Sequence, residues 1–131
     1  KVLVAEDSEV NQFIIKELLA IYGITPVIVD NGEQAVARFL SECFELVFMD
    51  IQMPIMDGVE ATKKIREAQT LEGINADCFI VGLSAHAMSG DRERYLEQGM
   101  DDYMTKPIDI DELGVLLKRL LKQPSSLMLW R

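Results

Sequence analysis

The sequence predicts an α/β fold, a doubly wound five-stranded parallel sheet with five helices. Two features predict it: short apolar runs alternate along the chain with segments of helical periodicity, and four of these runs end in charged or hydroxyl residues. Strands buried on both faces of a parallel sheet appear in a sequence as continuous apolar runs. Strict alternation of strand and helix predicts right-handed crossovers, which place helices on both faces of the sheet.

Each element follows from the pattern of its own segment. Apolar runs predict strands at residues 2–5, 25–29, 45–50, 79–83 and 102–105. Apolar residues spaced at i, i+3 and i+4 predict helices at residues 9–22, 33–40, 59–68, 91–98 and 110–122. Glycine is common just after a helix, so Gly23 and Gly99 are expected to end the first and fourth helices. The polar stretch 69–77 is the expected place for an insertion.

Three of these helices carry an apolar stripe, which predicts the side that packs on the sheet. The predicted core positions are Val10, Phe13, Ile14, Glu17, Leu18 and Ile21 in the first helix, Ala35, Val36, Phe39 and Leu40 in the second, and Leu113, Leu116, Leu117, Leu120 and Leu121 in the last. With these stripes turned inward, 131 residues suffice for one domain with a sizeable core.

The charge of the chain limits its partners. There are 22 acidic and 13 basic residues, which give a formal net charge of −9. Such a surface repels nucleic acid and anionic membranes, and it favours cations or basic patches on proteins. We therefore expect no direct nucleic acid binding and no membrane contact by this segment.

The remaining composition predicts a cytoplasmic domain. Cys43 and Cys78 are far apart and lack the spacing of a zinc or redox motif, so we expect two buried thiols in a reducing compartment. No stretch approaches the 18 or so apolar residues of a membrane span, and residues 1–4 resemble a strand rather than a signal peptide. The missing initiator methionine suggests a domain cut from a longer chain, which could be membrane-anchored elsewhere.

Polar residues follow four of the five predicted strands. Glu6 and Asp7 follow the first, Asp50 ends the third, Ser84 follows the fourth and Lys106 follows the fifth. Ligands of open parallel sheets bind beyond the carboxyl ends of the strands, so these side chains are expected to converge.

The chemistry of this set predicts phosphoryl acceptance. Two carboxylates about 4 Å apart repel by roughly 4 kcal/mol at an effective dielectric constant of 20, so the cluster requires a cation. An all-oxygen cluster suits Mg²⁺. Lys106 adds a positive charge and Ser84 a hydroxyl donor, which leaves Asp50 as the candidate nucleophile.

Each residue also has an ordinary structural interpretation. Asp7 or Ser8 could cap the following helix, Asp50 could be a turn residue, and Ser84 a loop hydroxyl. Lys-Pro is a common dipeptide. The joint occurrence of all four features at successive strand ends favours a functional site.

On these residues the chain resembles the receiver domain of two-component response regulators, from residue 1 to about 123. The matching segments are Val-Ala-Glu-Asp-Ser at 4–8, Phe-Met-Asp-Ile-Gln-Met-Pro-Ile-Met-Asp-Gly at 48–58, Gly-Leu-Ser-Ala-His-Ala at 82–87 and Tyr-Met-Thr-Lys-Pro at 103–107. The resemblance implies the flavodoxin-like receiver fold with strand order 2-1-3-4-5. The sequence departs from the family's commoner residues at Glu6 and Ser84, and neither difference removes the site.

The resemblance also implies roles for the acidic residues. Asp50 would be the phosphoacceptor and a Mg²⁺ ligand, and Asp7 would bind Mg²⁺ directly. Glu6 would act through water, and the backbone carbonyl of Gln52 would complete the protein ligands.

Further roles follow for residues of the last two strands. Ser84 and Lys106 would bind the phosphoryl oxygens and assist catalysis, and a shift of the Ser84 hydroxyl would be coupled to rotation of Tyr103. Tyr103 could equally be a packing residue. The Lys106–Pro107 peptide would be cis. His86 would tune water access or be an exposed loop residue.

Segments 6–12, 49–54 and 60–62 look most similar to receivers of hybrid sensor histidine kinases. This implies a phosphorelay with a histidine kinase or a histidine phosphotransfer domain docked on the first helix, and it leaves a homodimer open. Enzymatic activity of the receiver itself would be limited to self-phosphotransfer and autodephosphorylation. Residues 124–131 could be a linker, a docking tail or a cloning remnant.

Three rival functions have distinct sequence requirements. A flavodoxin-like cofactor binder needs phosphate-binding donors where this chain has Glu6 and Asp7. A haloacid-dehalogenase-like phosphatase needs a carboxylate where this chain has Gln52. An interaction-only receiver that is never phosphorylated is the serious alternative, and the complete set of site residues argues against it.

Overall fold

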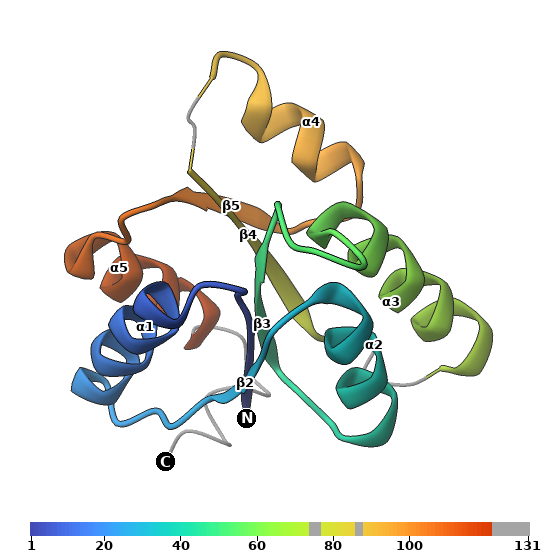
Figure 1. Cartoon of the computed structure of the whole chain (residues 1–131), viewed down its shortest axis with the longest axis horizontal. Coiled ribbons are helices and arrows are strands. Elements are labelled where there is room, and N and C mark those ends of the chain that lie inside the picture. Colours follow the sequence, from blue (N-terminus) through green and yellow to red (C-terminus); the bar gives the residue numbers. More distant parts are fainter. Residues whose placement is uncertain (74–76, 86–87, 122–131) are drawn as a thin grey trace.

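The computed structural model describes residues 1–73, 77–85 and 88–121, and it confirms the predicted fold class. One parallel sheet has the strand order β2-β1-β3-β4-β5 (Figure 1). The strands are β1 (Val2–Ala5), β2 (Val27–Val29), β3 (Leu46–Asp50), β4 (Phe79–Ser84) and β5 (Asp102–Thr105). The helices are α1 (Glu9–Ile21), α2 (Gly32–Ser41), α3 (Gly58–Glu72), α4 (Asp91–Glu97) and α5 (Ile110–Leu121).

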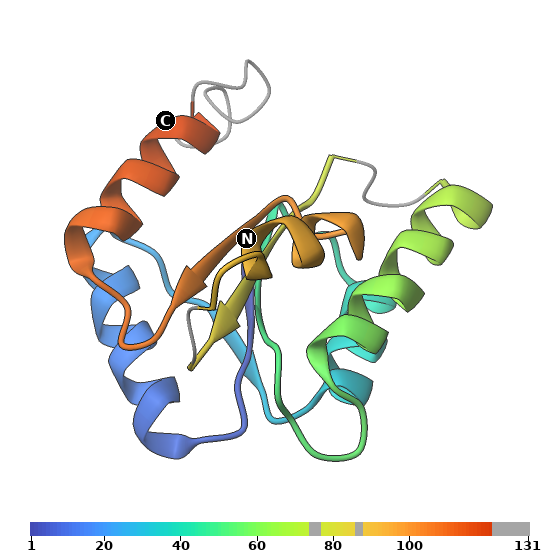
Figure 2. The same cartoon turned by 90° about the horizontal axis from the view of Figure 1, so that it is seen from above.

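Helices cover both faces of the sheet. Helices α1 and α5 lie together on one face and α2 and α3 on the other, as both views show (Figures 1 and 2). Each face has its own apolar cluster, and Tyr95 of α4 joins the cluster beneath α2 and α3. The sheet is therefore the middle of three layers, and all strands point their carboxyl ends to the same edge.

Burial on both faces explains the unbroken apolar runs. All four residues of β1 and all five of β3 are buried. In β3 the run ends at Asp50, which pairs in register with Leu83 of β4. Ser84, one residue further along β4, pairs with Thr105 of β5, so the polar strand ends lie side by side.

Side-chain caps fix where three helices begin. Ser8, Asn31 and Asp57 each take an extended backbone conformation and accept a hydrogen bond from the backbone N–H three residues later. A cap of this kind satisfies one of the unpaired N–H groups of the first helical turn and typically stabilises a helix by about 1 kcal/mol. Of the two candidates for the cap of the first helix, Asp7 and Ser8, it is Ser8 that caps α1.

Two element boundaries differ from the predicted ones by more than one residue. Strand β2 begins at Val27 rather than at 25. Helix α3 runs to Glu72 and ends at Gly73, whose φ of 66° is left-handed, so the first part of the stretch predicted as an insertion is helical. The long polar helix end was missed because its solvent-facing turns bury no apolar residue after Ile65.

The predicted core face of α1 is wrong except at Leu18, which is partly buried against the core. Val10, Phe13 and Ile21 have 68%, 63% and 63% of their surface exposed, whereas Ile15 and Leu19 are buried. The helical period was right, but α1 carries two apolar stripes. The sheet packs against the shorter stripe, which contains Ile15 and Leu19. The longer stripe faces outward and leaves an apolar surface on α1.

Two other burial predictions are corrected. Leu40 of α2 is 49% exposed because it lies off the face that carries the buried Ala35 and Phe39. Cys43 is exposed in the loop between α2 and β3, while Cys78 is buried as predicted, and both are free thiols. Leu113, Leu116 and Leu117 of α5 are buried and Leu120 is partly buried, as predicted, and the side chain of Leu121 lies outside the described residues.

None of the described helices has the length and apolar character that crossing a membrane would require.

The loop after β3 packs tightly beneath Asp50. The N–H of Gly58 donates to the carbonyl of Ile51 at 3.0 Å, and a Cβ atom added at Gly58 would overlap the backbone carbonyl of Asp50. Ile55 in the same loop has a φ of 69°, which is strained for a β-branched residue. Only glycine fits at position 58, so this residue sets how closely α3 approaches the end of β3.

We predict that Gly58→Ala lowers the free energy of unfolding by about 2 kcal/mol, because the backbone atoms that it meets have little room to move. Gly114→Ala in α5 is the matched control. Its Cβ would meet only the end of the Tyr22 side chain, which can shift, and the better helix propensity of alanine offsets part of the loss. Urea unfolding of both variants measures the difference, and equal losses would contradict this account.

Candidate functional site

The structure brings the polar strand ends together in one pocket. Glu6 and Asp7 follow β1, Asp50 ends β3, and Ser84 ends β4. Lys106 follows β5, and its backbone N–H donates to the carbonyl of Ser84 at 2.7 Å. All five residues line the pocket, so side chains from positions 6 to 106 share one site at the carboxyl edge of the sheet.

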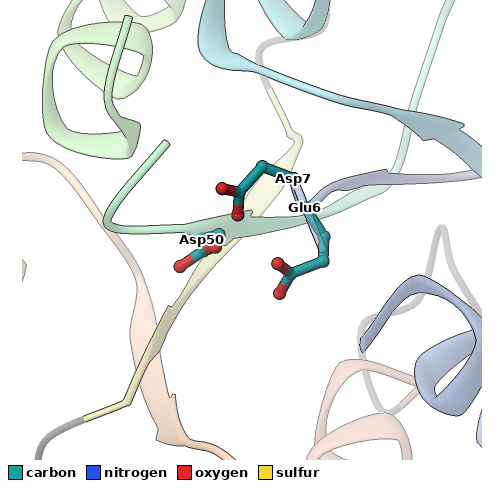
Figure 3. A group of neighbouring side chains, drawn as sticks. All are labelled: Glu6, Asp7 and Asp50. Atoms are coloured by element: carbon teal, nitrogen blue, oxygen red, sulfur yellow. The ribbon is translucent and has the colours of Figure 1, made fainter. Parts of the chain in front are cut away.

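Three of the carboxyl groups that line this pocket lie close together (Figure 3). Glu6 and Asp50 are buried, with 1% and 3% of their surface exposed, whereas Asp7 is open to solvent. One oxygen from each of the three lies within 4.8 Å of the others. Clustered hard oxygen donors with one solvent-accessible side fit Mg²⁺, which retains waters in its coordination shell.

Lys106 partly neutralises this cluster. Its Nζ lies 3.0 Å from Oε1 of Glu6 and 3.2 Å from Oδ2 of Asp50, and the side chain is only 16% exposed. Burial lowers the pKa of Lys106, but the hydrogen bond to Glu6 and the charge of Asp50 together raise it above its ordinary value. Lys106 therefore stays protonated between the two buried carboxylates.

A single ammonium group does not compensate Asp50 fully. Burial, followed by the charge of Glu6, raises the pKa of Asp50 to about 7, and Lys106 only partly opposes this shift. Ionisation of Asp50 is thus unfavourable in the metal-free protein. A second cation next to Asp7 would favour the ionised form.

The loop after β3 holds Asp50 from the backbone side. The N–H of Gln52 donates to Oδ1 of Asp50 at 3.3 Å, and the N–H of Ile51 donates to the carbonyl of Leu83 at 2.9 Å. Gln52 lines the pocket, next to the acidic cluster. The loop is therefore tied both to the Asp50 side chain and to β4.

Ser84 and Tyr103 lie on neighbouring strands and interact. Ser84 is 7% exposed at the end of β4, and Tyr103 of β5 pairs in register with Gly82. Burial and the nearby charge of Asp91 raise the pKa of Tyr103, and a hydrogen bond with Ser84 opposes that rise. The Lys106–Pro107 peptide bond is cis. His86 lies outside the described residues.

Residues of α4 that the sequence reasoning missed also line the pocket. Asp91, Arg94 and Tyr95 are among its lining residues, together with Met88, which precedes the helix. Tyr95 is buried, and its ring centroid lies 5.4 Å from that of Tyr103. The sequence predicts a short helix after the fourth strand, but its pattern does not reveal that residues of this helix line the pocket.

Known proteins are similar to this chain in sequence and in fold. The family model of the response regulator receiver domain matches residues 2–118. Hybrid signal transduction histidine kinase I of Dictyostelium discoideum is 46% identical over 114 residues, which are 83% of this chain and 6% of that protein. The chain spans between 3% and 13% of the length of the first relatives of this kind.

Two solved structures are informative neighbours. The receiver domain of the sensor histidine kinase PA1611 from Pseudomonas aeruginosa, with magnesium coordinated in its active-site cleft, superposes with a TM-score of 0.79 at 34% identity over 92% of this chain and 95% of that one. The receiver domain of Saccharomyces cerevisiae Ssk1, crystallised with the histidine phosphotransfer protein Ypd1, gives 0.79 at 33% identity, over 92% of this chain and 85% of that one.

We predict that Asp50→Asn stabilises the metal-free protein. The neutral amide removes a buried charge that burial and Glu6 both disfavour, so the free energy of unfolding at pH 8 in a chelator should rise by about 2 kcal/mol. Asp77→Asn, at an exposed position, should change it by less than about 0.5 kcal/mol. Urea unfolding measures both values, and a loss of stability in Asp50→Asn would mean that the pair with Lys106 outweighs the repulsion.

Proposed function

This chain belongs to the response regulator receiver domain family of two-component systems, and from that premise we propose that Asp50 is its phosphoacceptor and that a phosphohistidine is the donor. The observation that carries the proposal is the position of Asp50, which lies at the end of β3 between Lys106, Glu6 and the pocket. A carboxylate held in place at the floor of an open pocket can reach an incoming phosphorus atom. It fits a site whose catalysis consists mainly of positioning and charge neutralisation.

The donor set supports Mg²⁺ as the cofactor. Asp7 and Asp50 would bind the ion directly with the backbone carbonyl of Gln52, and Glu6 would act through water. When bound, Mg²⁺ would supply positive charge that offsets the carboxylates and the transferred phosphoryl group. The three clustered carboxyl groups and the raised pKa of Asp50 favour this assignment.

Asp50, Lys106 and Ser84 then have separate roles in phosphoryl transfer. A carboxylate oxygen of Asp50 attacks phosphorus and forms the P–O bond of an acyl phosphate, while the electron pair of the breaking P–N bond returns to the donor imidazole. Lys106 exchanges its contact with Asp50 for a phosphoryl oxygen, and Ser84 donates its hydroxyl hydrogen to another. Ser84 thereby moves relative to Tyr103, which makes these two residues the proposed switch.

The first test of this proposal is phosphorylation by a small donor. Wild type incubated with acetyl phosphate and Mg²⁺ should gain one phosphoryl group by intact mass, and excess chelator should prevent it. Asp50→Asn should give no adduct, because an amide is not a nucleophile. Asp57→Asn is the matched control, since Asp57 lies in the same loop and only caps α3.

The proposal would be contradicted if wild type binds Mg²⁺ but forms no adduct with either of two donors, acetyl phosphate or a phosphorylated phosphotransfer protein. The chain would then be an interaction-only receiver. An adduct in Asp50→Asn would move the acceptor to another residue.

We further propose that the outward face of α1 docks a histidine phosphotransfer domain. Val10, Phe13 and Ile14 form an exposed apolar stripe there, and we call this stripe the α1 patch. Ser8 and Asn11 of the same segment line the pocket, so the α1 patch borders the site of phosphoryl transfer. The co-crystal of Ypd1 with the Ssk1 receiver supports a partner of this class.

The relatives support a wider setting for this exchange. Hybrid and sensor histidine kinases are among the matches, so we propose that the chain works as a receiver segment of such a kinase, in the cytoplasm. The phosphoryl group would come from the histidine of the kinase and pass on to the phosphotransfer domain.

Phe13→Ser should slow transfer between the chain and a phosphotransfer protein at least tenfold, because it removes a central apolar contact of the α1 patch. Phosphorylation by acetyl phosphate should remain unchanged, since the pocket itself is intact. Leu71→Ser is the control, because Leu71 is 82% exposed on α3 instead. Rapid-quench transfer assays separate the outcomes, and equal rates for the two variants would remove α1 from the interface.

A further inference from the structure

The described part of the pocket has a wall on α4 that the proposed transfer chemistry does not use. Helix α4 lies beside β5, the edge strand of the sheet (Figure 1). Asp91, Arg94 and Tyr95 of α4 line the same pocket as Asp50. These three residues are linked to one another and to Tyr103.

The side chains of Arg94 and Tyr95 make two contacts with each other. Nη2 of Arg94 donates to the hydroxyl of Tyr95 at 3.0 Å, and the guanidinium carbon lies 4.9 Å from the centroid of the same ring. A guanidinium group over a tyrosine ring is an attractive cation–π contact. Tyr95 as a whole is 7% exposed, so Arg94 contacts a residue that belongs to the core.

Asp91 fixes Arg94 from the other side. Its Oδ1 lies 2.9 Å from Nη2 of Arg94, and its Oδ2 accepts the N–H of Met88 at 3.1 Å. The Asp91 side chain is only 8% exposed, so this carboxylate is rigidly placed. Asp91, Arg94 and Tyr95 thus form one linked group, which we call the α4 clamp.

The α4 clamp acts on Tyr103. The rings of Tyr95 and Tyr103 lie 5.4 Å apart at an interplanar angle of 40°, within the range of attractive aromatic pairs. The charge of Asp91 also contributes to the raised pKa of Tyr103, so this carboxylate lies close enough to affect the phenol. A hydrogen bond with Ser84 acts on the same phenol. The contacts therefore run from Arg94 through Tyr95 and Tyr103 to Ser84.

We propose that Arg94 is a positioning residue that, through Tyr95 and Tyr103, holds Ser84 in the resting arrangement and so sets how readily the site accepts a phosphoryl group. This inference rests on the proposed function, because Ser84 must leave Tyr103 to reach the phosphoryl oxygens. Any contact that favours the resting arrangement lowers the apparent affinity for a phosphoryl group or its analogue. Weakening the α4 clamp should therefore tighten binding.

The test uses beryllofluoride, a phosphoryl analogue, at saturating Mg²⁺, with binding followed by amide chemical shifts. Arg94→Gln and Tyr95→Phe should each lower the apparent Kd about fivefold, a typical coupling between sites. Tyr95→Phe keeps the ring pair and loses only the hydroxyl that Arg94 contacts. The double variant should bind about as tightly as Arg94→Gln alone, because Arg94→Gln already removes the hydrogen bond that Tyr95→Phe removes.

Arg92→Gln is the matched control. Arg92 lies on the same helix with similar exposure, and it pairs with Asp102 rather than with the α4 clamp. Its apparent Kd should equal that of wild type. Thermal unfolding of all variants shows whether stability changes, and a merely structural role of Arg94 would lower stability without tightening beryllofluoride binding.

The outcomes separate the two proposals. If wild type binds beryllofluoride and the Kd of Arg94→Gln is unchanged or raised, the role of the α4 clamp is overturned. Phosphoryl acceptance by the site would still stand. Absence of Mg²⁺-dependent binding in wild type would overturn both proposals. Fully additive effects in the double variant would show that Arg94 and Tyr95 act separately, which would also overturn the α4 clamp.

Discussion

The ion pairs of Lys106 with two buried carboxylates are the interaction around which the site is organised. Glu6 and Asp50 come from neighbouring strands β1 and β3, and without Lys106 Nζ their charges would face each other without compensation. Removing Lys106 would leave two buried carboxylates uncompensated, and removing a partner so that a buried charge is uncompensated typically costs about 3–5 kcal/mol. To place Lys106 there, the chain returns from the edge strand β5 across the end of β4, where its N–H bonds to the Ser84 carbonyl. This return brings the hydroxyl of Ser84 and the ammonium of Lys106 to the same pocket.

The same geometry explains why the strand ends and their polar residues were predictable. A strand buried on both faces has no polar residue until it leaves the core, so the first polar residue marks the edge of the sheet. Asp50 is the clearest case, because the four residues before it are buried and apolar. The convergence of Glu6, Asp50 and Ser84 follows from this rule. Lys106 does not, because it follows the edge strand β5, which already contains Asp102 and Thr105.

Features that depend on contacts between distant elements were not predictable in this way. Helix α1 has apolar side chains on two sides, and periodicity cannot tell which side meets the sheet: Ile15 and Leu19 are buried, and Phe13 is not. The exposure of Cys43 depends on the path of a loop. The position of Arg94 over Tyr95 depends on how α4 lies against β5, which a seven-residue helix does not reveal in its sequence.

The long separation of Lys106 from its partners along the chain has a consequence for biosynthesis. Lys106 lies 100 residues after Glu6, so a ribosome has made almost the whole domain before the ammonium group exists. Domains emerge from the ribosome with the N-terminal parts first, at about 5–20 residues per second. During that interval β1 and β3 can pair only with their carboxylates hydrated or protonated. A nascent or truncated chain that ends before β5 therefore lacks the counter-charge of Glu6 and Asp50, and the ion pairs of the site can form only after β5 has been translated.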